Sequence, residues 1–141
     1  MAALSDPLET IATWVLGSVL PDGARLTYAD EDAVDELAEN PRRINAEWLW
    51  RVAELEPSIT DLNTHRSAYH LELVGLWSST GSARLASIIS GVVVDVARKL
   101  ETTATPDGVD LVQITGRVAY EDRLGVTAVT IPVKVSIHEE A

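Results

Sequence analysis

The stretch YHLELVGLW at residues 69–77 decides how the sheet of this chain is built. Its residues alternate in the way that a β-strand with a buried face requires. One face carries four large apolar side chains, those of Tyr69, Leu71, Leu73 and Trp77. Val74 and Leu76 are apolar on the opposite face, near the end of the strand. The strand therefore needs an apolar neighbour on each of its two faces.

A long helix is predicted directly after this strand, beyond the polar sequence SSTG. From about residue 82 to residue 101 the apolar residues recur with the period of an α-helix. The stripe consists of Leu85, Ile88, Ile89, Val92, Val96 and Leu100. Burial of these side chains contributes on the order of 10 kcal/mol before the entropy of the chain is subtracted. We expect this helix to cover one face of the strand.

The first half of the chain supplies a helix and two strands in this interpretation. Residues 5–20 form an amphipathic helix, and the sequence ARLTY at 24–28 is consistent with a short strand. Residues 47–56 alternate as a strand does and are followed by Pro57, which we expect to end it. A long polar loop then leads to residues 69–77, so that the two strands are antiparallel neighbours.

The C-terminal part of the chain is predicted to be a long β-hairpin. Residues 109–120 and 126–140 both alternate with a period of two, and the sequence EDRLG turns the chain between them. Pro132 lies inside the second strand and has no N–H to donate. One side of that strand is therefore free, bulged, or paired across a subunit boundary.

These elements predict one α+β domain over residues 1–141, with an antiparallel sheet of about four to five strands and two helices packed against it. An acidic segment at about 30–42 interrupts the pattern, and its high charge predicts a mobile, solvated excursion. Its acids are Asp30, Glu31, Asp32, Asp35, Glu36 and Glu39.

Charge and composition exclude several classes of protein. There are 22 acidic residues against 11 Lys and Arg, giving a formal net charge of −11, which argues against a surface that grips nucleic-acid phosphates. The chain has no Cys and so no disulfide or thiolate site. Its first 20 residues lack a basic region and an uninterrupted apolar run, and predict neither a secretory signal nor a membrane span.

No catalytic residue, metal ligand set or cofactor site is predicted. His65, His70 and His138 lie far apart in the sequence and lack metal-ligand spacing. Carboxylates such as Asp110 fit ordinary surface acids. Core packing is the default for Trp48 and Trp50, and burial at a subunit contact is the alternative.

Several patterns in the element order are similar to the tail-terminator family of long-tailed, siphovirus-like phages. The resemblance rests on the N-terminal helix LETIATWVLGSVL, the strand YHLELVGLW running through a short turn into the helix SARLASIISGVVVDVARKL, and the closing strand VTAVTIPVKVSIHEE. Ring proteins of the phage neck, such as head–tail completion proteins, are similar in size to this chain and remain an alternative.

The resemblance implies a structural virion protein without enzymatic activity. It would be a homohexameric ring, assembled in the host cytoplasm, that caps the tail tube, stops its polymerisation and joins it to the head connector. Its partners would be further copies of itself, the tail-tube protein and the connector, with DNA passing through the channel and no membrane. An acidic lumen would let DNA slide, and the acids at 30–39 are the candidates for the channel or a partner-facing surface.

A subunit contact would then explain the second apolar face of the central strand. The hypothesis places six residues at this contact: Trp48, Trp50, Val74, Leu76, Val129 and Ile131. Two other classes stay open. One is a small-molecule-binding or enzymatic α+β domain with a tryptophan-lined pocket, and the other is an adaptor that presents its acids to a basic partner.

Overall fold

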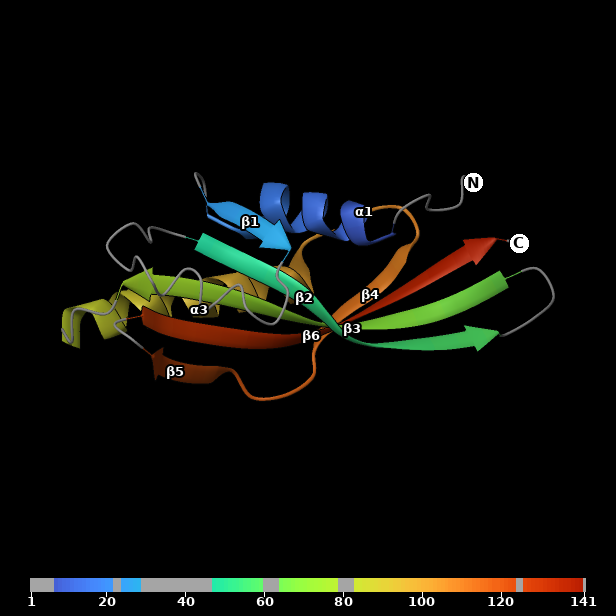
Figure 1. The fold of residues 1–141 in the computed structure, drawn as a ribbon. Coiled ribbons are helices and arrows are strands. Elements are labelled where there is room, and N and C mark those ends of the chain that lie inside the picture. Colours follow the sequence, from blue (N-terminus) through green and yellow to red (C-terminus); the bar gives the residue numbers. More distant parts are fainter. Residues whose placement is uncertain are drawn as a thin grey trace.

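A computed structural model describes residues 7–21, 24–28, 47–59, 64–78, 83–123 and 126–140. The predicted α+β class is confirmed: helices pack against one sheet that curls as a half-barrel (Figure 1). The helical elements are α1 (Pro7–Trp14), a π-helical turn (Val15–Val19) and α3 (Ala83–Thr102). The strands are β1 (Arg25–Tyr28), β2 (Glu47–Ile59), β3 (Thr64–Ser78), β4 (Val109–Ile114), β5 (Ala119–Arg123) and β6 (Val126–Glu140).

The stretch at 69–77 lies in β3, the central strand of the sheet. The strand order is β1-β2-β3-β6-β4, and β5 pairs with β6 beyond this path. β3 is antiparallel to both β2 and β6, as predicted. The sheet is nevertheless mixed rather than purely antiparallel, because β1 pairs with β2 in the parallel direction. The sequence of β1 is too short to carry a signal for its direction.

The prediction that Pro57 ends the second strand and begins a long loop is wrong. β2 continues through Pro57, which pairs with Ser67 of β3, and residues 60–63 alone separate the two strands. The reason is the short reach of β1, which pairs with β2 only as far as Trp50. Among the described residues β2 is an edge strand beyond that point, and an edge strand tolerates a proline because one row of N–H groups needs no partner.

The predicted strand over 109–120 is interrupted beside Pro132. β4 ends at Ile114 and β5 begins at Ala119, and both pair with β6. At the break, the Thr115 N–H donates to the Pro132 carbonyl at 3.1 Å. Thr115 and Pro132 continue the register of β4. A hydrogen-bonded antiparallel residue pair normally makes two hydrogen bonds, but here one is missing because Pro132 has no N–H. On the side of β6 that faces β4 and β5, the pairing is therefore interrupted next to Pro132, and pairing across a subunit boundary stays a prediction.

Both predicted helices form, with changes in detail. The described part of the N-terminal helix is α-helical from Pro7 to Trp14 and then widens into the π-helical turn, where the Leu20 N–H donates a hydrogen bond to the Val15 carbonyl at 2.9 Å. α3 matches the predicted helix to within a residue at each end. Among the side chains of α3 whose burial is described, four apolar ones are buried: Ile89, Val93, Val96 and Leu100.

The main core lies between the helices and one face of the sheet. It joins Ile11, Trp14, Val15 and Val19 and the buried residues of α3 to alternate residues of β2, β3, β4 and β6. The other face also has buried apolar side chains at one end, outside this main cluster. They are Leu49, Val74, Leu76 and Ala128, each with at most 7% of its surface exposed. Both faces of the central strand are therefore covered within one chain.

Candidate functional site

The six residues predicted at a subunit contact do not form one surface. The cross-strand pairs put Trp48, Trp50, Val129 and Ile131 on the face that meets the helices and Val74 and Leu76 on the other face. Five of the six are buried, and Leu76, Val129 and Ile131 are fully inaccessible. These five side chains are packed in the interior of the single chain and leave almost no area for a neighbouring subunit, and their part in a subunit contact stays a hypothesis.

The predicted acidic surface falls outside the described residues. All six acids between Asp30 and Glu39 lie in the range 29–46, outside the described residues. Their role in a channel or at a partner surface stays a prediction.

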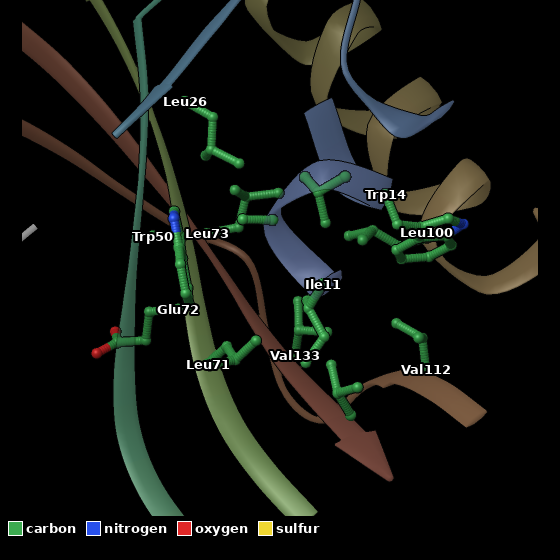
Figure 2. A pocket seen from close by; sticks show the side chains of 13 residues that line it. Ile11, Trp14, Leu26, Trp50, Leu71, Glu72, Leu73, Leu100, Val112 and Val133 are labelled. Atoms are coloured by element: carbon green, nitrogen blue, oxygen red, sulfur yellow. The ribbon is translucent and has the colours of Figure 1, made fainter. Parts of the chain in front are cut away.

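A pocket lies between α1 and the sheet (Figure 2). About 20 Å³ of free space is open inside it. α1 and the π-helical turn provide one wall, and side chains from β1, β2, β3, β4, β6 and α3 provide the others. The lining residues are Ile11, Ala12, Trp14, Val15, Leu26, Trp50, Leu71, Glu72, Leu73, Leu100, Val112, Val133 and Val135.

The local sequence of α1 explains how the pocket forms. Ile11, Trp14 and Val15 recur at the helical spacing that places them on one face, and all three are buried. The Trp14 Nε1–H donates to the Ala104 carbonyl at 2.8 Å, which fixes the indole against the segment that follows α3. Ala12 adds only a methyl group to the same wall. The small side chain at this position leaves the space unfilled.

The sequence interpretation anticipated a tryptophan-lined pocket only in part. Trp50 lines the pocket, whereas Trp48 packs edge-to-face against Trp77 in the core. Trp14 was missed. Its spacing from Ile11 on the predicted helix is the signal that could have indicated it.

Polar side chains pair across the opposite face of the sheet. Arg51 Nε contacts Glu72 Oε1 at 3.0 Å between neighbouring strands. Farther along, His138 Nδ1 lies 2.6 Å from Asp110 Oδ1. Asp110, read from the sequence as a surface acid, is thus a histidine partner. Within the described ranges, no three His, Asp or Glu residues gather in a way that could hold a metal ion.

Among the described residues, four large apolar side chains are exposed, and they lie on separate elements. They are Leu16 on the π-helical turn, Val94 on α3, Leu111 on β4 and Tyr120 on β5, each between 44% and 55% exposed. In the part of the chain that the structure describes, none of the helices has the length and hydropathy of a membrane span.

The chemistry that this arrangement offers is hydrophobic contact. The pocket presents an apolar surface, and the paired polar groups lie away from it on the other face of the sheet. No protein-family model matches the sequence, and no curated protein has significant similarity to it.

Proposed function

We propose that this chain is a structural ring subunit similar to the tail terminators of long-tailed phages. In this role the ring caps the tail tube, stops its polymerisation and joins it to the head connector. The subunit would act by shape and surface contact, as part of the virion tail or neck, and would carry out no reaction.

The observation that carries the proposal is the arrangement around β3. This strand occupies the centre of the sheet, and residues 79–82 alone separate it from α3. The last strand, β6, returns to pair with β3 along the full length of both, from Thr64 with Glu140 to Ser78 with Val126. An N-terminal helix, a central strand leading into a long helix, and a closing strand are the features on which the resemblance rests.

The contact surfaces of such a ring must be sought among exposed groups. Leu16, Val94, Leu111 and Tyr120 are the exposed large apolar side chains of the described residues. Leu111 and Tyr120 lie on β4 and β5, which flank β6 at the side of the sheet away from β3. Aromatic residues are enriched at subunit contacts, so Tyr120 is the first of these candidates to examine.

The test is the mass of the purified chain by light scattering over a range of concentrations, followed by mixing with tail-tube subunits. We expect a mass near six times the 15.3 kDa of one chain, and tubes whose length becomes uniform in its presence. A chain that stays monomeric at every concentration and binds neither end of the tube would contradict the proposal. Tube protein with an unrelated acidic domain of similar size is the control for nonspecific charge effects.

A further inference from the structure

We propose that the pocket between α1 and the sheet is a binding site for one small apolar molecule, of the size of xenon or a short hydrocarbon. The pocket involves no subunit contact, so ligand binding there does not depend on whether the chain forms a ring. Either proposal can fail while the other holds.

The lining of the pocket sets the chemical class of the ligand. Twelve of the thirteen lining residues have apolar or aromatic side chains, and the surface that they present is apolar. Glu72 is the exception, but its carboxylate points away from the pocket in Figure 2 and contacts Arg51 on the other face of the sheet. The Trp14 Nε1–H is bonded to the Ala104 carbonyl. A polar ligand would lose its hydrogen bonds with water and gain none here.

The size of the free space distinguishes this pocket from ordinary packing defects. Its volume of about 20 Å³ exceeds the roughly 10–15 Å³ of cavity volume that is needed to hold a single water molecule. A bound water also needs two to four polar partners, so an apolar space of this kind stays dry. The lining atoms therefore lack contacts on one side, and an apolar guest would supply the missing dispersion attraction.

The position of α1 provides a route of entry. This helix has eight residues, of which Ile11 and Trp14 are buried, and it forms one wall of the pocket. A helix this short is marginal by itself and depends on its packing. Local opening of such an element has a lower free energy than opening of the central strands, which lets a guest enter without global unfolding.

The experiment uses xenon as the probe and the methyl resonances of the intact chain as the readout. Under increasing xenon pressure, we expect progressive, saturating shifts at methyl groups that line the pocket, such as those of Ile11, Leu71 and Val133. Methyl groups on the other side of the sheet, such as those of Val74 and Leu76, serve as the internal control because they lie outside the lining.

Two variants change the space in opposite directions. Ala12→Val fills it and should abolish the saturating shifts, whereas Val133→Ala enlarges it and should make them saturate at lower pressure. Because the two substitutions act on different elements, the proposal can still be tested if one variant does not fold. Shifts of equal size at Leu71 and Val74, or no saturating shift at any lining methyl group of the parent chain, would overturn the site.

Discussion

Trp48 and Trp77 meet edge to face, with ring centroids 5.5 Å apart and ring planes at 78°. Gly75 makes this contact possible. It pairs with Trp48 across β2 and β3, and a Cβ at its position would lie 2.7 Å from Trp77 ring atoms and 2.9 Å from Trp48. The other residues on the core face of this part of β3 are large. Gly75 has no side chain, and two indole rings occupy the space beside it.

Substitution Gly75→Ala should therefore destabilise the fold. The added methyl group collides with atoms of both indole rings, and overpacking of this kind costs about 1–3 kcal/mol. Urea unfolding followed by circular dichroism measures the loss. An unchanged midpoint would mean that the two indoles can separate freely and that their packing does not depend on the glycine.

Gly91→Ala on α3 is the matched substitution and should have the opposite sign. Apart from the two neighbouring residues and the backbone of α3 itself, no described atom lies within 4 Å of a Cβ at Gly91, which is exposed. Alanine favours the interior of a helix over glycine by roughly 0.8–1 kcal/mol. We expect a gain in the free energy of unfolding of up to this amount in the same urea experiment. A loss would show that this face of α3 is in contact with another part of the assembly.

The break between β4 and β5 predicts a contrast between two substitutions in β6. Pro132→Ala supplies the missing N–H opposite Thr115. The new hydrogen bond, worth about 1 kcal/mol, offsets the stability that is lost because the unfolded chain is freer without the proline. Lys134→Pro removes a donor where Lys134 pairs with Gln113 of β4, at a cost of about 1–3 kcal/mol. Equal losses in the two variants would contradict the assignment of the break to Pro132. Hydrogen exchange at the new amide of residue 132 gives a second readout.

The period of the apolar residues correctly predicted the long, half-buried elements. It failed at positions where the structure depends on which strand lies alongside. β3, β6 and α3 each repeat one pattern over many residues, so their type and place follow from local sequence. Whether a strand continues through Pro57, or loses pairing beside Pro132, depends on the neighbouring strands. At Pro57 it depends on where β1 stops pairing, and at Pro132 on the β4–β5 break, and local sequence specifies neither.

The candidate site was harder to predict for the same reason. Its lining residues come from eight elements that meet only after folding, and each residue alone fits an ordinary core position. An unfilled space is a property of their combined volumes. Alternation and helical spacing carry no information about that sum.

The Arg51–Glu72 pair should contribute little to stability despite its short contact of 3.0 Å. The two side chains are 36% and 30% exposed, so solvent screens their attraction. A double-mutant cycle with Arg51→Met and Glu72→Gln should give a coupling energy of about 0.2–1 kcal/mol that falls as salt is added. A coupling of several kcal/mol that salt leaves unchanged would show that this face of the sheet is shielded from solvent in the functional state.

A single experiment on Ile131 can distinguish a core residue from an interface residue. It is fully inaccessible within one chain, so Ile131→Ala should cost about 2–5 kcal/mol, and the loss should not depend on protein concentration. Leu111→Ala is the control: Leu111 is 48% exposed, and truncation there should change the free energy of unfolding of the single chain by less than about 0.5 kcal/mol.

The concentration dependence decides where each of these two side chains acts. A residue at a subunit contact stabilises the folded chain by mass action, so its removal lowers the unfolding midpoint more at high protein concentration than at low concentration. If Ile131→Ala shows this dependence, the strand would have to rearrange on assembly to bring the side chain to the surface. If Leu111→Ala shows it instead, the contact lies on the exposed edge of β4, as the proposed ring allows.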